Sequence, residues 1–298
     1  MAAERPSEGS GFATAGTGRS PLVSVVVACL NAATTIRACV TSVLEQEGGL
    51  AELLVLDGGS EDGTLEVLDE FRERLAYFRS RSDRGVYFAW NDAIGHVRGE
   101  WIYFLGADDV MWTPDVFLRL APILRSADSA VSIVYGPVAF LDSSGQEMAV
   151  VGRPWREAVN PFFRGGNLCH QGVFHRRSLF GSRRFDTSFR ILGDYDFLLG
   201  VLSTSEPLFV PDVVVAGYST GGMSSRPGNF LRSLRENHRA LRKNGRGPGF
   251  WRRQRQYLGA LCAVVLVRGA SRLSENLKRR ALARVLLGNA SMTRTRCR

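Results

Sequence analysis

Two adjacent carboxylates, Asp108 and Asp109, are the side chains of this 298-residue chain that most directly suggest chemistry. They follow the apolar run Trp101–Leu105, whose aromatic and aliphatic residues predict a short buried strand. Adjacent carboxylates repel each other and resist burial, so they favour a cation or a wet surface. Hard oxygen ligands suit Mg²⁺ or Mn²⁺, ions that usually also hold a substrate phosphate. A solvated turn after the strand is the alternative.

Two more acidic loops follow predicted strands. Asp57 closes an apolar run and precedes two glycines, where the backbone can approach a ligand and a carboxylate can accept hydrogen bonds from a nucleotide. The alternative is a simple turn that caps the next helix. In the segment SDRG, Asp83 could contact a nucleotide and Arg84 a phosphate, or the segment could be a polar turn.

The elements that must position these residues alternate between strands and helices. We expect strands at residues 22–28, 53–56, 76–79, 101–105 and 132–136, helices at 34–46, 64–75 and 86–96, and a helix opened by Pro114. Such alternation predicts an α/β fold with a parallel, helix-covered sheet. Right-handed crossovers would then place Asp57, Asp83 and the Asp108–Asp109 pair along one sheet edge.

The second half of the chain has a different pattern. We expect a hairpin over residues 138–151, a strand at 170–176, and helices at 194–202, 235–243, 251–268 and 274–287. The composition divides the chain into a disordered leader at 1–20, a catalytic domain at 21–222 and a basic helical extension at 223–298.

The charge of the chain is concentrated in that extension. Residues 230–298 contain 18 Lys and Arg against two acids, Glu236 and Glu275, whereas the rest contains 20 bases and 27 acids. Basic amphipathic helices of this kind are typical of segments that lie on an anionic membrane. The alternatives are packing on the catalytic domain or formation of a homodimer. No stretch reaches the roughly 18 apolar residues that a membrane span needs.

Five scattered cysteines without a Cys-x-x-Cys motif argue against a zinc site and fit a reduced, cytoplasmic setting.

Six motifs in fixed order resemble those of family 2 glycosyltransferases, which have the type A nucleotide-sugar-binding (GT-A, Rossmann-like) fold. They are VSVVVACLN (23–31), LDGGSEDGT (56–64), SDRGVYFAWN (82–91), GEWIYFLGADD (99–109), HQGVFHR (170–176) and DYDFL (194–198). The resemblance spans roughly Leu22 to Tyr218. It is closest to a subgroup that makes lipid-linked and capsular sugars, including colanic-acid-type and phenolic-glycolipid (PGL/p-HBAD) transferases. A mixed central sheet with C-terminal basic helices is the implied architecture.

The resemblance implies a donor side and a metal. Residues on the nucleotide-sugar side would be Asn31, Asp57, Asp83, Arg84, Asn91 and Asp108. Asp108 would contact the ribose or the metal, and Asp109 would ligate Mg²⁺ or Mn²⁺ on the diphosphate.

The resemblance also implies a base and an acceptor side. Asp194 would be the catalytic base, and His170 and Gln171 would line the acceptor or sugar side. The attacking hydroxyl has a high pKa, so a carboxylate must take its proton, and a single displacement inverts the anomeric carbon. From the residues alone, Asp194 could instead cap its helix and His170 could be a core histidine. Asp196 points to another helix face and is the weaker candidate.

Two positions depart from the pattern of many relatives. Gly193 stands where an acidic residue often precedes the base, and Phe88 stands where an Asp is common. Phe88 leads to the hypothesis of a more apolar donor sugar, such as a deoxysugar.

We therefore expect an inverting glycosyltransferase that moves a sugar from a nucleotide-diphosphate sugar to a hydroxyl of a glycolipid or lipid-linked saccharide in cell-envelope synthesis. It would lie on the cytoplasmic face of the membrane. A nucleotidyltransferase is the alternative, although Ala28–Asn31 lacks the Gly- and Lys-rich phosphate loop that such an enzyme would carry. A nucleic-acid-binding protein is suggested by the tail charge alone, and the acidic first part argues against it.

Overall fold

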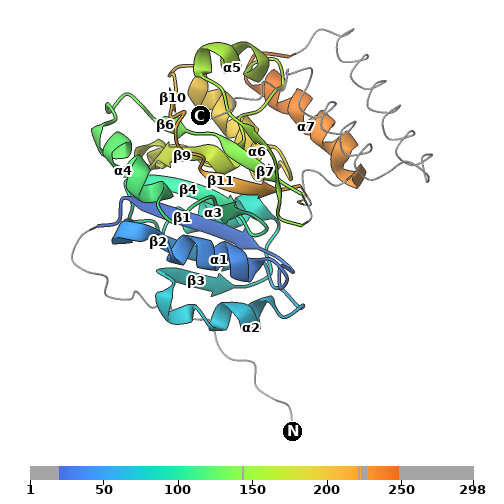
Figure 1. Ribbon diagram of the computed structural model, residues 1–298. Coiled ribbons are helices and arrows are strands. Elements are labelled where there is room, and N and C mark those ends of the chain that lie inside the picture. The colour runs from blue at the N-terminus through green and yellow to red at the C-terminus, as the bar shows by residue number, and fades with distance from the viewer. Residues whose placement is uncertain (1–19, 143, 221, 223–226, 248–298) are drawn as a thin grey trace.

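The computed structural model describes residues 20–142, 144–220, 222 and 227–247 (Figure 1). Its first half alternates strands and helices, as the sequence pattern predicts. The strands are β1 (Val23–Cys29), β2 (Ala51–Asp57), β3 (Tyr77–Ser80) and β4 (Trp101–Gly106), and the helices between them are α1 (Ile36–Leu44), α2 (Thr64–Asp69) and α3 (Val86–Ala93). The helix expected at 64–75 is shorter than predicted, because a separate 3₁₀ turn forms at Arg72–Arg74.

These strands belong to a seven-stranded sheet with the order β10-β6-β9-β4-β1-β2-β3. Strands β4, β1, β2 and β3 are mutually parallel, whereas β9 (Val173–Arg176) lies antiparallel between β4 and β6 (Ile133–Tyr135). The edge strand is β10 (Leu208–Phe209). The sheet is therefore mixed, as expected. Because Cys29 pairs with Asp57 and Ala28 with Gly106, the parallel strands end at one common edge.

The core occupies both faces of this sheet because successive strand residues point to opposite sides. Val25 and Val27 of β1 pack with α1, α2 and α4 (Val116–Ser126), while Val26 packs with α3 and with the C-terminal helices. Cys29 and Cys39 are buried thiols.

A second sheet of four strands lies beside the first. Its order is β5 (Val110–Met111), β11 (Ala216–Ser219), β7 (Val138–Leu141) and β8 (Glu147–Val151), and β7 and β8 form the expected antiparallel hairpin. Helix α5 (Trp155–Phe162) follows it and was not predicted.

The strand expected at 170–176 begins only at Val173, which corrects that prediction. Residues His170–Gly172 form a 3₁₀ turn instead. A Cβ on Gly172 would lie 2.4 Å from the carbonyl oxygen of Gly136, so the chain passes too close to a neighbouring segment for a side chain there.

The last two described helices are α6 (Gly193–Leu202) and α7 (Phe230–Lys243). They lie side by side at the end of the molecule opposite to β3 and α2 (Figure 1). The expected boundary at residue 222 stays a prediction, although α7, beyond it, packs on α6. The leader at 1–20, except Ser20, and the helices expected at 251–268 and 274–287 lie outside the described residues.

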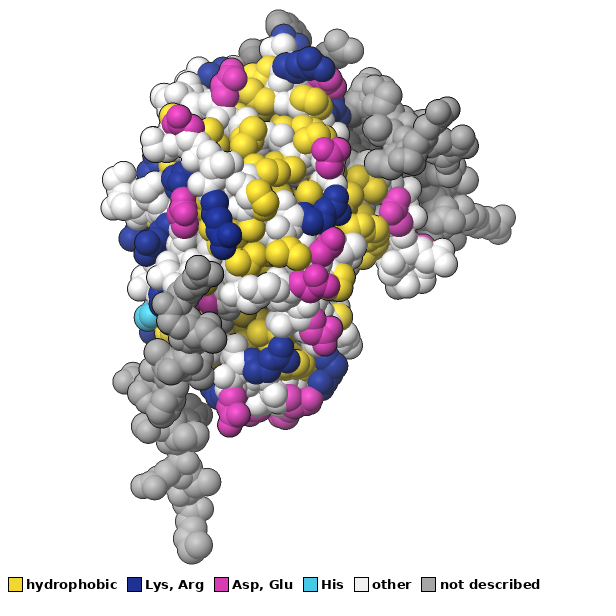
Figure 2. Space-filling view, turned by 60° about the vertical axis from the view of Figure 1, so that its left-hand side comes forward, with side chains coloured by type: hydrophobic (Ala, Val, Ile, Leu, Met, Phe, Trp, Pro, Cys, Tyr) yellow, Lys and Arg dark blue, Asp and Glu magenta, His cyan; other side chains and the backbone are white. Residues whose placement is uncertain are grey.

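No helix in the described part of the chain combines the length and apolar character needed to cross a membrane. On the face shown in Figure 2, basic, acidic and hydrophobic side chains of the described residues are interspersed.

Candidate active site

Asp57, at the end of β2, anchors the loop that follows. Its side chain is fully buried, and its carboxylate accepts hydrogen bonds from the backbone N–H groups of Gly59 and Ser60 at 2.9 and 3.0 Å. The hydroxyls of Ser60 and Ser80 donate to it at 2.5 and 2.6 Å. Burial opposes ionisation of Asp57, but these hydrogen bonds outweigh it and hold its pKa below the usual value. Asp57 is thus an ionised residue that shapes the loop, and its expected contact with the nucleotide stays a prediction.

Asn31 joins the loop after β1 to the loop after β2. Its backbone N–H donates to the Ser60 hydroxyl at 2.8 Å, and its side-chain oxygen accepts from the Glu61 N–H at 3.0 Å. Its φ of 51° lies in the left-handed region, which Asn adopts more readily than most residues. Asn31 is exposed, so the carboxyl edge of the sheet presents it to solvent.

Asp83 brings a third loop to the same edge. Its Oδ1 lies 3.5 Å from the position that a Cβ on Gly58 would take, so the loops after β2 and β3 are in contact. The carboxylate accepts a hydrogen bond from the Gly85 N–H at 2.9 Å and lies 3.7 Å from the Arg79 guanidinium. The expected convergence of the Asp57 and Asp83 loops is confirmed by this contact.

Two other residues expected on the donor side have partners within the chain. The side chain of Asn91 pairs with the backbone N–H and C=O of Phe185, both at 2.9 Å, and so ties α3 to the segment that leads to α6. Arg84 is exposed, and its guanidinium lies 4.5 Å from the centre of the Phe88 ring. Phe88 therefore forms a cation–π contact with Arg84.

The carboxylates of Asp108 and Asp109 converge over Gly106. A Cβ on Gly106 would lie 2.5 Å from Oδ2 of Asp109 and 3.0 Å from Oδ1 of Asp108, so a side chain there would displace the two carboxylates. Asp109 is 1% exposed and accepts hydrogen bonds from the Ser219 N–H at 2.8 Å and the Gln171 amide at 3.1 Å. Burial, together with repulsion from Asp108, raises the pKa of Asp109 to about 7.

Asp108 is less buried than its neighbour and faces Gly222, where a Cβ would lie 2.7 Å from its Oδ2. The expected roles of Asp109 as metal ligand and of Asp108 toward the ribose or the metal stay predictions. Among the described residues, no three His, Cys, Asp or Glu side chains form a metal-binding group. A pair of carboxylates nevertheless fits Mg²⁺ or Mn²⁺, because a donor diphosphate and water supply the other oxygens. A cation would also relieve the repulsion at Asp109.

Gln171 and His170 connect the carboxylate pair to the middle of the sheet. Gln171 donates to Asp109, and its carbonyl accepts from the Tyr103 hydroxyl at 2.6 Å. The His170 ring stacks on Trp90, with ring centres 5.1 Å apart. Burial lowers the pKa of His170, an effect that nearby Asp194 opposes. The structure thus brings His170 into the neighbourhood of the expected base.

Asp194 lies in the first turn of α6, half-buried, beside Tyr87 of α3. The Tyr87 hydroxyl is 2.7 Å from the carbonyl oxygen of Ile191 and 3.2 Å from Oδ1 of Asp194. A Cβ on Gly193 would lie 2.8–2.9 Å from the Tyr87 ring, so the packing of this ring favours glycine at position 193. Asp196 is instead committed to Lys243, at 2.7 Å, and to Asn244.

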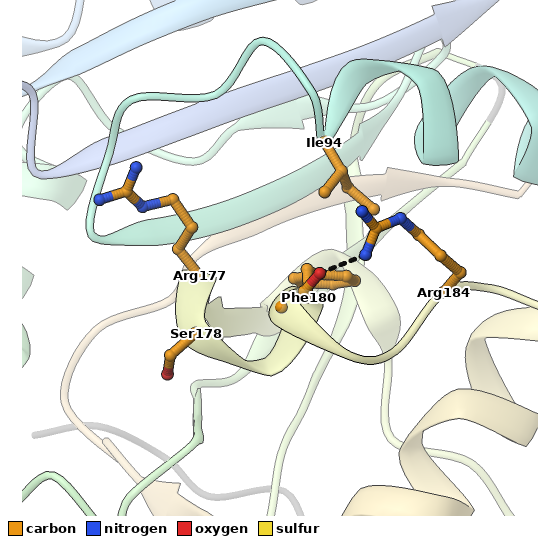
Figure 3. Close-up of a pocket in the computed structure, with 6 residues that line it drawn as sticks. Ile94, Arg177, Ser178, Phe180 and Arg184 are labelled. Carbon is orange, nitrogen blue, oxygen red and sulfur yellow. Dashed lines mark hydrogen bonds between the residues drawn. The ribbon is translucent and has the colours of Figure 1, made fainter.

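A separate cavity of about 400 Å³ lies at the opposite end of the sheet. It is lined by Ile94, Arg177, Ser178, Phe180, Gly181 and Arg184 (Figure 3). The Arg177 N–H donates to the carbonyl of Glu100, just before β4 begins, so this cavity is remote from the strand ends that carry the carboxylates.

Comparison with known proteins identifies the family of the chain. The model of Glycosyl transferase family 2 matches residues 24–186, more than half of the chain. The chain belongs to glycosyl transferase family 2. A PGL/p-HBAD biosynthesis glycosyltransferase of Mycobacterium tuberculosis is 34% identical over 217 residues, which cover 69% of this chain and 80% of that protein. The succinoglycan biosynthesis protein ExoO of Rhizobium meliloti is 30% identical over 231 residues, which cover 73% of this chain and 65% of that protein.

Solved structures show the same fold at low sequence identity. The mannosyltransferase PcManGT of Pyrobaculum calidifontis gives a TM-score of 0.60 at 18% identity, covering 89% of this chain and 81% of that one. Staphylococcus aureus TarS 1–349 gives 0.56 at 14% identity, with coverage of 89% and 80%. The expected GT-A fold and glycosyltransferase class are confirmed, and the nucleotidyltransferase alternative is wrong.

Within this family 2 glycosyltransferase, sequence reasoning missed Tyr87. It lies inside the quoted motif SDRGVYFAWN, one helical turn before Trp90, so the motif contained the signal. What the spacing could not supply was its partner, since Asp194 lies 107 residues further along the chain.

Proposed function

We propose that this glycosyltransferase moves a sugar from a nucleotide-diphosphate sugar to a hydroxyl of a glycolipid or lipid-linked saccharide, with inversion. The observation that carries the proposal is the joint placement of two kinds of carboxylate. Asp83, Asp108 and Asp109 lie at the carboxyl edge of the sheet, where ligands bind in open α/β folds. Asp194 reaches the same region from α6, because its charge acts on the pKa of His170. The next residue after His170, Gln171, donates a hydrogen bond to Asp109.

The donor side is supported by charge and by structural neighbours. PcManGT was solved with GDP-Man and Mn²⁺, and TarS was solved with UDP-GlcNAc. Exposed Asn31 and Arg84 and partly exposed Asp83 supply polar groups suited to a nucleotide and its phosphates. Asp108, with Asp109 behind it, would hold Mg²⁺ or Mn²⁺, which when bound neutralises charge on the departing nucleoside diphosphate.

The remaining steps belong to the chain itself. Asp194 takes the proton from the attacking hydroxyl as the new C–O bond forms, while the bond from the anomeric carbon to the diphosphate breaks. One base opposite the leaving group gives inversion. Nε2 of His170 and Nε1 of Trp90 are buried without a hydrogen-bond partner among the described residues, which supports the assignment of His170 to the sugar or acceptor side.

The acceptor and the location rest on relatives and on charge. A relative named for PGL/p-HBAD biosynthesis favours a glycolipid acceptor. Arg232, Arg235 and Arg242 are exposed, and their spacing places them on one face of α7. We therefore assign this enzyme to the cytoplasmic face of an anionic membrane, held by α7 and the basic residues beyond it. The same surface could form a homodimer, which analytical ultracentrifugation would reveal.

A donor screen tests this proposal. Thermal shift of the full chain is measured with UDP-, dTDP- and GDP-sugars, with and without MnCl₂, and the anomeric configuration of any product is read by NMR. We expect one donor class to stabilise the enzyme only with metal. Asp108→Asn should lose that metal-dependent shift, whereas Asp128→Asn, at a remote turn, should keep it. No shift and no transfer with any donor would refute the proposal.

A further inference from the structure

Glu236 is one of only two acids in the basic C-terminal part of the chain, and it is buried in α7 at 8% exposure. Its partners are three consecutive backbone N–H groups on the segment before α6. Arg190 donates to Oε1 at 3.0 Å, while Ile191 and Leu192 donate to Oε2 at 2.9 and 3.0 Å. The carboxylate therefore receives backbone hydrogen bonds directly ahead of the helix that begins at Gly193.

Burial of the Glu236 carboxylate carries a desolvation free energy that its hydrogen bonds must offset. Removing a carboxylate from water costs several kcal/mol unless hydrogen bonds replace its hydration. Three N–H donors do so here, and bonds to an ionised acceptor are stronger than neutral ones. An anion ahead of a helix N-terminus is also favoured by the helix dipole. Because Glu236 spans three successive residues, it fixes the path of the backbone rather than one side chain.

The same segment is held from its other side by α3. The Tyr87 hydroxyl lies 2.7 Å from the Ile191 carbonyl oxygen, and Asn91 pairs with the backbone of Phe185. The stretch from Phe185 to Leu192 is thus clamped between α3 and α7 immediately before Asp194.

Other contacts of α7 hold the helix in place without touching residues 190–192. Lys243 forms ion pairs with Asp186 at 2.8 Å and with Asp196 at 2.7 Å. Arg239 lies over the Phe189 ring at 3.7 Å. These contacts provide a matched comparison, because they stabilise the packing of α7, whereas Glu236 is the α7 residue that binds the backbone of residues 190–192.

We propose that Glu236 is a positioning residue for sugar transfer, which acts by fixing the backbone that sets the orientation of Asp194. This inference rests on the proposed function, since it assumes that Asp194 is the base. A loosened base affects the chemical step more than donor binding, because reaction rates depend steeply on the alignment of reacting groups. Glu236 therefore contributes to kcat and not to the donor KM.

The test compares Glu236→Gln with Lys243→Gln in the full chain. The Gln amide keeps the size of the side chain but turns one acceptor oxygen into a donor. We expect Glu236→Gln to lower kcat roughly tenfold with the donor KM within about twofold. Lys243→Gln should lower Tm by about as much as Glu236→Gln does, and it should change kcat by less than about twofold. The proposal would be overturned if the two variants lowered kcat equally, or if Glu236→Gln raised the donor KM and left kcat unchanged.

Two further measurements separate the possible failures. Hydrogen exchange of the wild-type enzyme should show protected amides at residues 190–192, and exchange as fast as in an open loop would overturn the proposal even if Glu236→Gln fails to fold. Asp194→Asn should abolish transfer while sparing donor binding. Transfer by Asp194→Asn would refute the base assignment in the proposed function, whereas an inactive Asp194→Asn beside a fully active Glu236→Gln would refute only the role of Glu236.

Discussion

The hydroxyl of Tyr87 lies 3.2 Å from the carboxylate of Asp194, so a residue of α3 contacts the expected base at the start of α6. Burial and the nearby Asp194 raise the pKa of Tyr87 well above its usual value, so the hydroxyl keeps its proton and remains a donor. The Ile191 carbonyl is the second acceptor in reach, at 2.7 Å. The Tyr87 hydroxyl thus lies within hydrogen-bonding distance of a backbone carbonyl and of a side chain at the start of α6.

We expect Tyr87→Phe to retain the fold and lower kcat by about threefold to tenfold, because the ring stays packed while one hydrogen bond of about 1 kcal/mol is lost. Steady-state kinetics with saturating donor measures the effect. The donor KM should be unchanged. A rise in the donor KM without a change in kcat would contradict the idea that this hydroxyl acts through Asp194.

Gly193→Ala should be destabilising even though alanine favours helices. The added methyl would lie 2.8–2.9 Å from the Tyr87 ring, and overpacking of this kind typically costs about 1–3 kcal/mol. Urea denaturation measures the loss. Its control is the double variant Gly193→Ala with Tyr87→Ala, which should lose less than the sum of the two single losses. Additive losses would show that the clash is relieved elsewhere.

Asp109 should make stability depend on pH in metal-free buffer. Its pKa in the folded chain is about 7, above the value of about 4 for an unfolded Asp, so the folded state holds a proton that the unfolded state has released. This contribution is complete below about pH 4 and is lost as pH rises to about 7, amounting to at most a few kcal/mol. The pKa of Asp57 is lowered, so Asp57 acts only at more acidic pH.

The measurement for Asp109 is Tm against pH with EDTA present. Asp109→Asn keeps an oxygen for the Ser219 N–H and removes the charge, so its Tm relative to wild type should rise from pH 4 to pH 8. Asp128→Asn, at an exposed turn, serves as the control and should show no such trend. A constant difference between Asp109→Asn and wild type would count against the raised pKa.

Membrane attachment predicts binding that depends on salt and on arginine. Changing Arg232, Arg235 and Arg242 together to Gln removes three exposed charges and should weaken pelleting with vesicles that contain anionic lipid. A chain ending at Gly247 separates the contribution of α7 from that of the residues after it. Neutral vesicles are the control, and unchanged pelleting of both variants would exclude the basic extension as the anchor.

The sequence allowed the sheet edge to be predicted because strand identity depends on local composition. The runs ending at Asp57 and at Asp108 are short and apolar, and parallel connectivity places their ends together. The roles within the Asp108–Asp109 pair could not be predicted in the same way. Adjacent residues point in different directions, and which one is buried depends on Ser219 and Gln171, 110 and 62 residues away.

Other features were missed because they depend on packing across long sequence separations. The motif HQGVFHR indicates a strand, but only the close approach of Gly172 to Gly136 shows that the strand starts at Val173. Glu236 resembled a minor acid in a basic tail. Its 44–46-residue separation from its partners gives no periodic signal, since the contact arises from the packing of α7 on α6.

The position of Glu236 also has a consequence for the order in which the enzyme is made. A chain leaves the ribosome from its N-terminus, and domains begin to fold as they emerge. The carboxylates Asp57, Asp83, Asp108 and Asp109 all precede Asp194, whereas the acid that holds the backbone ahead of Asp194 comes more than 40 residues after it. We therefore expect a growing chain to form its nucleotide side first, and to acquire an ordered base only when α7 is released.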